Sequence, residues 1–355
     1  MDKFKKWLSK FFIDGLSGMA LGLFSTLIVG TIIQQIGTLI GGNIGDIIFT
    51  LGKVAASVTG AGIGIGVAYK FKESALVVFS SATAGMIGAF ASKIIAGTIV
   101  EGSVVAFAGP GEPLGAFIAA YVAIEIGHLV SGKTKVDILI TPLVTIAAGS
   151  VVGLLLGPPI SALMNGLGSI INWATVQQPF VMGIVISVLM GIFLTLPISS
   201  AAIGVALGLS GIAAGAATVG CCCNMVGFAV ASFRENKTSG LLAQGIGTSM
   251  LQMPNIVKKP IIWVPAIVAS AILGPVSTML FNMTSNSVGS GMGSAGFVGQ
   301  IMSFQTMIAT ENIWIVLIKI VVIQFILPAA ISLLVSEFMR KMNWIKFGDM
   351  KLDMQ

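Results

Sequence analysis

Long apolar stretches, separated by short breaks rich in glycine, proline and polar residues, dominate the chain. The stretches that the pattern predicts to be helices lie near residues 15–40, 47–69, 75–97, 114–130, 137–157, 180–200, 201–216, 217–233, 260–274 and 311–337. Most of them approach the roughly 20 apolar residues that a helix needs to cross a bilayer. The pattern therefore predicts an all-α polytopic membrane protein with about ten transmembrane helices.

The composition supports this fold class and excludes several others. Of the 355 residues, 55% are hydrophobic and 9% are charged, and the mean hydropathy is +1.01, whereas soluble proteins carry roughly 25% charged residues. The 45 glycines suit helices that pack closely in a membrane. No phosphate-binding loop, zinc signature or nucleophile elbow occurs in its proper structural context. We therefore predict no catalytic residues, no metal and no cofactor.

The basic residues indicate an orientation in the membrane rather than a nucleic-acid partner. The net charge is +6, but Lys and Arg gather at the ends of the apolar stretches instead of forming one patch. If the basic start Met1–Trp7 is cytoplasmic, most of the 19 Lys and Arg residues also face the cytoplasm, as the positive-inside rule requires. We predict that both termini are cytoplasmic, that the lipid bilayer surrounds the chain, and that it binds no nucleic acid.

Three stretches fit neither an ordinary span nor an ordinary loop. Residues 158–179 begin with Pro158-Pro159, residues 240–257 alternate glycines with carboxamides, and residues 283–305 are rich in Ser, Gly and Asn. We interpret them as re-entrant or interfacial segments, because broken backbone at membrane depth is tolerated only inside protein or beside a cavity. If residues 240–257 formed a complete span, the predicted C-terminus would lie outside.

Short motifs recur in the same order along the two halves of the chain. The paired motifs are Ile138-Leu-Ile-Thr-Pro142 with Ile261-Ile-Trp-Val-Pro265, Leu156-Gly-Pro158 with Leu273-Gly-Pro275, and Leu196-Pro197 with Leu327-Pro328. We predict one transmembrane domain over residues 1–340, with repeat halves near 47–197 and 198–338, an extra helix at 11–40 and a cytoplasmic tail at 341–355. Broken helices at matching positions of a duplicated membrane fold are typical of a transporter site.

Residues 107–137 combine a helix break with most of the candidate chemistry of the first half. The Gly-Pro-Gly-Glu-Pro sequence at 109–113 cannot continue a helix and places Glu112 inside the break. The apolar segment that follows contains Glu125 and His128, which share one helical face because they are three residues apart. An acid at a break in a membrane helix favours substrate binding. Glu125 and His128 can hold each other, bind a solute or relay protons, or they can simply lie at the cytoplasmic end of the span.

In the second half, polar residues recur at helical spacing. Gln244, Thr248, Gln252 and Asn255 form one stripe, and Asn224 is a lone amide in an apolar stretch. Carboxamides and hydroxyls match the donors and acceptors of a sugar, but they also serve as hydrogen-bonding contacts between helices. Cys221–Cys223 diverge by about 100° per residue on a helix, so we interpret them as packing residues rather than metal ligands.

These motifs resemble those of a known family. The break at 109–113, the Gly-Lys-Thr-Lys-Val-Asp sequence at 132–137 and the repeated Leu-Gly-Pro are similar to the type-2 EIIC group of bacterial sugar phosphotransferase-system membrane subunits, which includes perfringolysin-regulator-like proteins. The resemblance implies a homodimeric permease in the bacterial plasma membrane, a sugar-binding role for Glu112, and phosphoryl transfer by separate EIIA and EIIB partners.

Two hypotheses remain for the function. The first is a carrier for a sugar or similar polar solute that works by alternating access, with substrate contacts from Glu112, Glu125, His128, Asn224, Gln244, Thr248, Gln252 and Asn255. The alternative is a membrane-embedded sensor or regulator that keeps the EIIC fold without phosphotransfer. A channel is a weaker third class, because no charged ring or filter sequence appears. We expect the solute to bind where residues 109–128 meet residues 240–255.

The Glu112 hypothesis predicts that Glu112→Gln weakens solute binding roughly tenfold, because a hydrogen bond to a charged group contributes about 1.5–3 kcal/mol. Glutamine keeps the shape of the side chain but loses the charge and one acceptor. Binding to the purified protein, followed by calorimetry or scintillation proximity, is the measurement. Unchanged affinity in a variant that folds and inserts normally would exclude this role.

Overall fold

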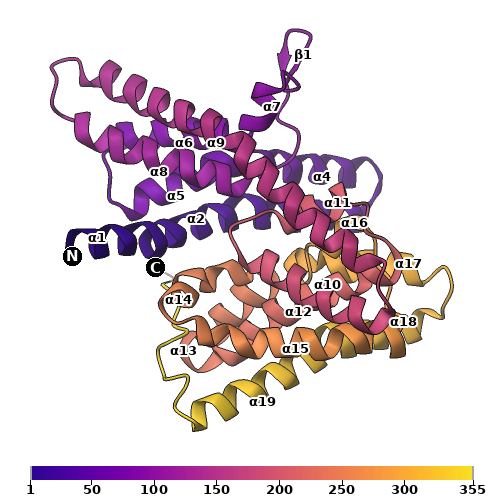
Figure 1. Ribbon diagram of the computed structural model, residues 1–355. Helices are drawn as coiled ribbons and strands as arrows, with labels where there is room; N and C mark the ends of the chain where they lie inside the picture. Colours follow the sequence, from indigo (N-terminus) through magenta and orange to yellow (C-terminus); the bar gives the residue numbers. More distant parts are fainter. Residues whose placement is uncertain (1, 354–355) are drawn as a thin grey trace. The chain divides into compact units, whose positions relative to one another are not determined.

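The computed structural model describes residues 2–353 and consists mainly of helices, with one short β-hairpin (Figure 1). The chain divides into two compact units, residues 1–163 and 164–355. The boundary falls inside one long helix, α9 (Asp137–Thr175). We call them the N-terminal unit and the C-terminal unit and describe each by itself.

The N-terminal unit contains eight further α-helices, which are apolar for most of their length. In chain order its elements are α1 (Asp2–Ser9), α2 (Leu16–Leu23), α3 (Val29–Ile40), α4 (Gly42–Ser57), α5 (Thr59–Lys70), α6 (Ala75–Ala89), α7 (Ala91–Ile95), β1 (Val100–Glu101), β2 (Val104–Val105), α8 (Pro113–Val130) and the first part of α9. Single π-helical turns join α1, α2 and α3, so that Lys6–Ile40 is one continuous apolar helix. Strands β1 and β2 pair antiparallel, with Val100 opposite Val105.

Glycines hold the N-terminal helices at backbone contact. A Cβ atom at Gly18 would lie 2.6 Å from the carbonyl oxygen of Gly66, and one at Gly64 would overlap the carbonyl of Ser81. The hydroxyl of Ser81 donates to the carbonyl of Gly64 at 3.0 Å. Helices in a membrane associate through such close packing because lipid supplies no hydrophobic driving force between them. The glycine-rich stretch of α5 is therefore a packing surface.

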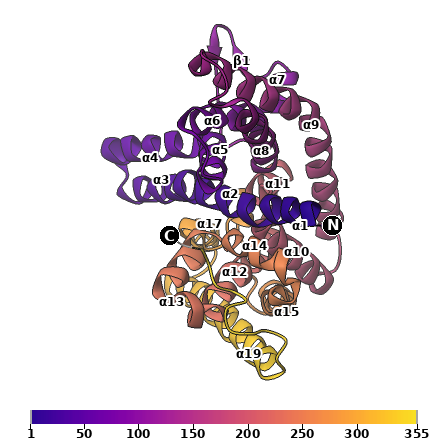
Figure 2. The same cartoon turned by 90° about the vertical axis from the view of Figure 1, so that its left-hand side faces the viewer.

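The C-terminal unit contains the remaining helices. After the end of α9 these are α10 (Pro179–Thr195), α11 (Ser200–Ala206), α12 (Gly211–Ala231), α13 (Phe233–Leu242), α14 (Met253–Lys258), α15 (Val264–Pro275), α16 (Ser287–Ser290), α17 (Val298–Met307), α18 (Ile313–Val321) and α19 (Leu327–Lys341). Helix α12 is the centre of the unit: α10, α15 and α19 all pack against it (Figure 2), and nearly all of its residues are buried.

Six helices of the described chain are long and apolar enough to cross a membrane, or up to seven if the bent pair α4–α5 counts as one span. They are Lys6–Ile40, Pro113–Val130, Asp137–Thr175, Gly211–Ala231, Pro260–Leu280 and Ile313–Lys341. Two further apolar helices, α6 and α10, are shorter. The all-α polytopic fold is confirmed, but the predicted count of about ten spans is not.

Two predicted boundaries are wrong for identifiable reasons. The predicted spans 201–216 and 217–233 are one helix, α12, preceded by the short α11, because the chain turns at Gly208 and Gly211, whose φ angles are 59° and 58°. Only glycine adopts such angles easily. The break expected at Pro158-Pro159 is absent, since α9 continues to Thr175 with both prolines inside it. Membrane helices tolerate proline where neighbouring groups satisfy the freed carbonyls.

The glycine contacts predict that Gly64→Ala destabilises the protein by about 1–3 kcal/mol, because the added methyl group overpacks the contact between α5 and α6. Gly166→Ala is the matched control, since nothing lies within 4 Å of a Cβ atom at that position. There the change should be neutral or slightly stabilising. Thermal unfolding of the detergent-solubilised variants is the measurement, and equal midpoints for the two would contradict the packing interpretation.

Candidate functional site

Three irregular segments converge on helix α12 in the C-terminal unit. We call them the first, second and third broken segments: residues 196–210 between α10 and α12, residues 243–252 between α13 and α14, and residues 281–297 between α15 and α17. The second consists of one π-helical turn, Ala243–Gly247, and one 3₁₀ turn, Ser249–Gln252. All three interrupt a helical, mostly apolar chain, and their backbone polar groups must therefore be satisfied inside the protein.

The first and third broken segments bond to each other. The hydroxyl of Ser200 donates to the carbonyl of Gly291 at 2.7 Å, and the N–H of Ser285 donates to the carbonyl of Gly211 at 3.2 Å. Gly293 has a φ angle of +53°, and a Cβ atom there would lie 2.6 Å from Cys221. The turn of the third segment is therefore pressed against the middle of α12.

The second broken segment joins the other two. The hydroxyls of Thr195, at the end of α10, and Ser249 are 2.7 Å apart. The hydroxyl of Ser294 donates to the carbonyl of Gly245 at 2.6 Å. Single hydroxyl bonds thus link the three broken segments around α12. Such bonds can exchange partners without the unfolding of a helix.

Asn224 is the polar centre of this arrangement. Its Oδ1 accepts bonds from the indole N–H of Trp263 at 2.8 Å and from the hydroxyl of Thr195 at 3.3 Å, while its Nδ2 donates to Ser270 Oγ at 3.3 Å and to the Gly220 carbonyl at 3.2 Å. The side chain is completely buried. Four bonds satisfy an amide fully, so Asn224 ties α10, α12 and α15 together.

We call Thr195, Asn224, Ser249, Trp263 and Ser270 the polar node. Sequence analysis singled out only Asn224 among them. A signal existed for Thr195, which directly precedes the Leu196-Pro197 break. Ser249 and Ser270 had none, since isolated serines in apolar stretches are common and their partners are distant in the chain.

The three cysteines lie against the same segments. Cys221 Sγ donates to the carbonyls of Met190 and Ser290 at 3.4 and 3.7 Å, and Cys222 Sγ accepts from the amide of Gln300 at 3.3 Å. All three thiols are free and fully buried. Among the described residues, no group of three or more His, Cys, Asp and Glu side chains could hold a metal ion. The three side chains pack inside the unit, and the interpretation that they are not metal ligands stays a prediction.

Three members of the predicted polar stripe meet and bind the end of the chain. Gln252 Nε2 donates to Gln244 Oε1 and to the carbonyl of Met350, both at 2.9 Å. Asn255 Nδ2 donates to Gln252 Oε1 and to the carbonyl of Lys351, also at 2.9 Å. The fourth member, Thr248, instead caps the following 3₁₀ turn through the N–H of Met250 at 3.2 Å. Whether any of the four contacts a solute stays a prediction.

The C-terminal tail, residues 342–353, is packed rather than free. Ile345, Met350 and Leu352 are buried. Asn236 bonds the tail backbone on both sides, donating to the Met350 carbonyl and accepting from the Leu352 N–H, each at 2.8 Å. Sequence analysis treated this stretch only as a cytoplasmic tail, because its anchors come from residues about one hundred positions away.

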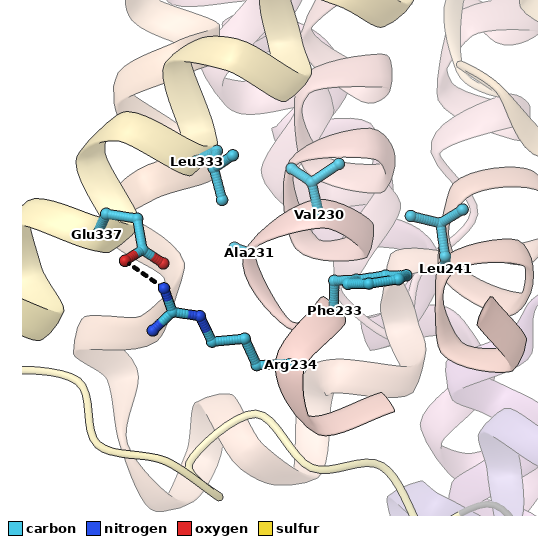
Figure 3. Close-up of a pocket in the computed structure, with 7 residues that line it drawn as sticks. All are labelled: Val230, Ala231, Phe233, Arg234, Leu241, Leu333 and Glu337. Atoms are coloured by element: carbon cyan, nitrogen blue, oxygen red, sulfur yellow. Dashed lines mark hydrogen bonds and ion pairs between the residues drawn. The ribbon is translucent and has the colours of Figure 1, made fainter. Parts of the chain in front are cut away.

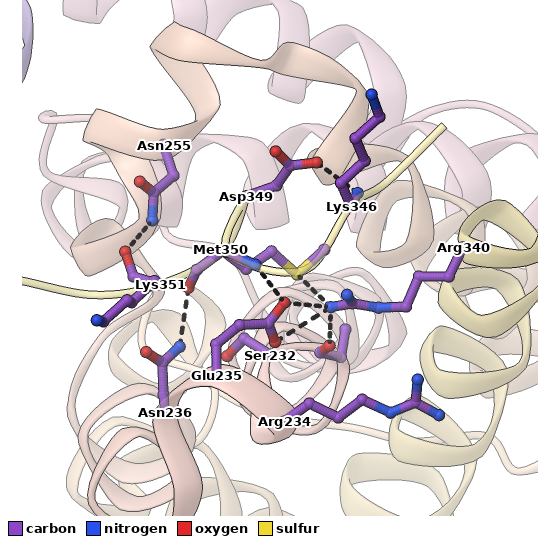
Figure 4. Close-up of polar contacts among 12 residues, drawn as sticks. Ser232, Arg234, Glu235, Asn236, Asn255, Arg340, Lys346, Asp349, Met350 and Lys351 are labelled. Carbon is purple, nitrogen blue, oxygen red and sulfur yellow. Dashed lines mark hydrogen bonds and ion pairs between the residues drawn. The ribbon is translucent and has the colours of Figure 1, made fainter. Parts of the chain in front are cut away.

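One ion pair lies just before the tail, and a second holds the tail near its end. Arg340 Nη2 lies 2.9 Å from Glu235 Oε1, and the Glu235 side chain is fully buried. Removing one partner of such a buried pair is strongly destabilising because the other charge stays buried. Nearer the chain end, Lys259 Nζ lies 2.6 Å from Asp349 Oδ2, which also accepts from the Lys346 N–H at 2.6 Å. Figure 4 shows the Glu235–Arg340 pair and the Asp349–Lys346 bond.

In the N-terminal unit, Glu112 occupies the start of a membrane helix. It is the N-cap of α8, where its Oε1 accepts a long bond of 3.5 Å from the Leu114 N–H, and its own N–H donates to the carbonyl of Ala89 at 2.8 Å. Gly111 must be glycine, because its φ angle is +72° and a Cβ atom would lie 2.7 Å from Ala89. The break therefore holds Glu112 in one place, half-buried, at the positive end of the helix dipole.

Glu125 and His128 do not bond each other. Glu125 Oε1 is 2.5 Å from Lys10 Nζ, which also lies 4.5 Å from the centre of the Phe71 ring. His128 Nδ1 is 2.9 Å from Glu73 Oε2. Helical spacing places Glu125 and His128 on the same side of α8, but each side chain pairs with a residue on a different element. The predicted meeting of residues 109–128 with 240–255 concerns two different units and stays a prediction.

The comparisons with known proteins identify one family. The family profile described as "Phosphotransferase system, EIIC" matches residues 13–352. No curated protein matches the chain. The matched range includes both units, the three broken segments and the C-terminal tail up to Leu352.

The contacts of Asp349 predict a pH-dependent tail. Burial raises the pKa of this carboxyl, but the hydrogen bonds from Lys259 and the Lys346 N–H, with the charges of Lys259 and Arg340, outweigh it and hold the pKa below the ordinary 3.8. The ionised carboxylate therefore stabilises the docked tail in full above pH 3.8, and this contribution is lost as the pH falls through the lower pKa of the folded state.

Hydrogen exchange of residues 345–352 between neutral pH and pH 3 measures this release. Asp349→Asn should loosen the tail already at neutral pH and remove the pH dependence in this range. Equal acid release in wild type and variant would assign the transition to other groups.

Proposed function

The chain belongs to the phosphotransferase system EIIC family, and from this premise we propose that it is the membrane carrier of a sugar or a similar neutral polar solute. The family is that of sugar-transport permease components, and the apolar helices agree with a multi-pass membrane protein. Our proposal concerns the identity of the solute, the transport mechanism and the partner proteins.

The convergence of three broken segments on helix α12, beside the polar node, is the observation that supports a carrier most directly. Transporters bind their solutes at discontinuous helices, where unwound backbone and a few side chains replace the water shell of the solute. Here Thr195, directly before the first break, and Ser249, in the second break, meet beside Asn224, inside a unit whose central helix is almost wholly buried. The third break bonds the second through Ser294 and Gly245.

The chemistry of the node suits a neutral polyol. Its members are one amide, three hydroxyls and one indole, and none of them is charged. Hydroxyls both donate and accept, as sugar hydroxyls do, and the half-buried Trp263 offers an apolar ring face for the C–H face of a sugar. We propose that a sugar hydroxyl replaces the Thr195–Ser249 bond, so that no polar group is left unsatisfied.

Alternating access would use the glycine hinges of the broken segments. Gly208 and Gly211 bound the turn between the first segment and α12, and Gly293 and Gly296 bound the turn of the third, all with positive φ. Glycine crosses between backbone conformations at low cost. Movement of these turns would open and close the node while α12 stays fixed.

Phosphorylation of the solute would depend on separate proteins. Cys221–Cys223 are fully buried in α12, out of reach of a phosphoryl donor. We propose, from the family alone, that separate EIIA and EIIB proteins act with this subunit and that it works as a homodimer in the bacterial plasma membrane. Cytoplasmic termini are proposed from the distribution of Lys and Arg.

Ser249→Ala tests the node. The variant should bind the sugar roughly tenfold more weakly, because one hydrogen bond at the breaks is lost at about 1.5 kcal/mol. Ser277→Ala is the matched control: Ser277 is equally buried in the same unit, but its hydroxyl donates only to the local carbonyl of Gly274 at 2.8 Å. Scintillation proximity with a panel of radiolabelled hexoses, hexitols and disaccharides identifies the probe that binds the wild type best.

If Ser249→Ala and Ser277→Ala bind the sugar with equal affinity, the solute binds elsewhere. If no sugar of the panel binds the folded wild type, the carrier proposal fails and the sensor hypothesis is favoured.

A further inference from the structure

A cleft of about 490 Å³ opens in the C-terminal unit, between the end of α12, helix α13 and helix α19 (Figure 3). Five of its seven lining residues are apolar, and the other two form an ion pair. They are Val230, Ala231, Phe233, Leu241 and Leu333, with Arg234 and Glu337. Pockets of this volume are large enough for a substantial part of an organic ligand.

The cleft lies where two membrane-crossing helices end. Its walls include the last turn of α12 and the last turns of α19, and both helices belong to candidate spans. On α19, Leu334 and Phe338 are exposed by 71% and 56%, which in a membrane protein marks a lipid-facing surface. The exposed Trp344, whose ring meets Phe338 edge to face, is typical of the membrane–water interface.

One basic and one acidic side chain line the cleft, and two further lysines are close to them in sequence. Arg234 is 61% exposed on its side chain and bonds Glu337 through Nη2 at 2.8 Å. Lys341, one helical turn beyond Glu337, and Lys237, on α13, are exposed. The neighbouring acid Glu235 is neutralised by Arg340. Arg234 therefore faces the interface with a single carboxylate and further N–H groups.

We propose that this cleft binds an anionic phospholipid. One acyl chain lies on Val230, Phe233 and Leu333, and the phosphate bonds the guanidinium of Arg234. A guanidinium matches a phosphate with two parallel hydrogen bonds. Lys237 and Lys341 add attraction for the negative headgroup.

Glu337 acts as the competitor for the phosphate in the empty cleft. An exposed ion pair such as Arg234–Glu337 is worth little, so a phosphate can replace the carboxylate at small cost. The Glu337 side chain is 31% exposed and can turn towards water. Because the phosphate and Glu337 compete for Arg234, substitutions of Arg234 and of Glu337 should change lipid binding in opposite directions.

The test compares dioleoyl phosphatidylglycerol with dioleoyl phosphatidylcholine on the purified full-length protein, by native mass spectrometry of lipid titrations. The wild type should retain phosphatidylglycerol preferentially. Arg234→Gln should abolish this preference, and Glu337→Gln should increase it about threefold to fivefold, because it frees Arg234 and removes a negative charge. If the ion pair had only a structural role, Arg234→Gln and Glu337→Gln would change the lipid preference in the same direction.

Two controls separate the cleft from general effects. Lys258→Gln removes one exposed charge at the end of α14, outside the cleft, and should leave the preference unchanged. Leu333→Trp fills the apolar wall and should weaken both lipids alike. Equal binding of the two lipids to the wild type, or equal losses in Arg234→Gln and Lys258→Gln, would overturn the proposal.

Discussion

A polar side chain inside an apolar helix bundle must find all its hydrogen bonds within the protein, and Asn224 is the place where this requirement organises the C-terminal unit. The amide draws Thr195, Trp263 and Ser270 from three other elements to the middle of α12. Because Thr195 also bonds Ser249, the second broken segment is fixed to the same point. One buried amide thus stabilises the end of α10 and the second break.

The second broken segment connects this node to the C-terminal tail. Ser249 bonds Thr195 at the node, and three residues later Gln252 bonds the tail through the Met350 carbonyl. Both contacts are made from one 3₁₀ turn, Ser249–Gln252. The carboxamides of Gln252 and Asn255 would each lose one bond, to the Met350 and Lys351 carbonyls, if the tail left, and an unsatisfied buried polar group costs about 1–3 kcal/mol. The docked tail is therefore part of the packing of the site.

Three ion pairs of the C-terminal unit lie near the ends of its helices, and they differ in how deeply they are buried. Glu235–Arg340 is buried and structural, Lys259–Asp349 is partly buried and holds the tail, and Arg234–Glu337 is exposed at the mouth of the apolar cleft. Burial decides which pairs can be exchanged, because the cost of separating two charges rises as water is excluded. The exposed pair is the one that a phosphate can replace.

Hydrophobic pattern alone determined the fold class, since only helices satisfy the backbone of such long apolar stretches, and the motifs at 109–113 and 132–137 pointed to the family. The pattern also singled out Glu112, Asn224 and the Gln244–Asn255 stripe as polar positions that need partners. The identity of those partners was decided by the tertiary structure: Glu125 bonds Lys10, His128 bonds Glu73, and the stripe bonds the tail. Helical spacing relates residues three or four positions apart, whereas these contacts join residues 55 to 115 positions apart, and only the packing of the helices brings them together.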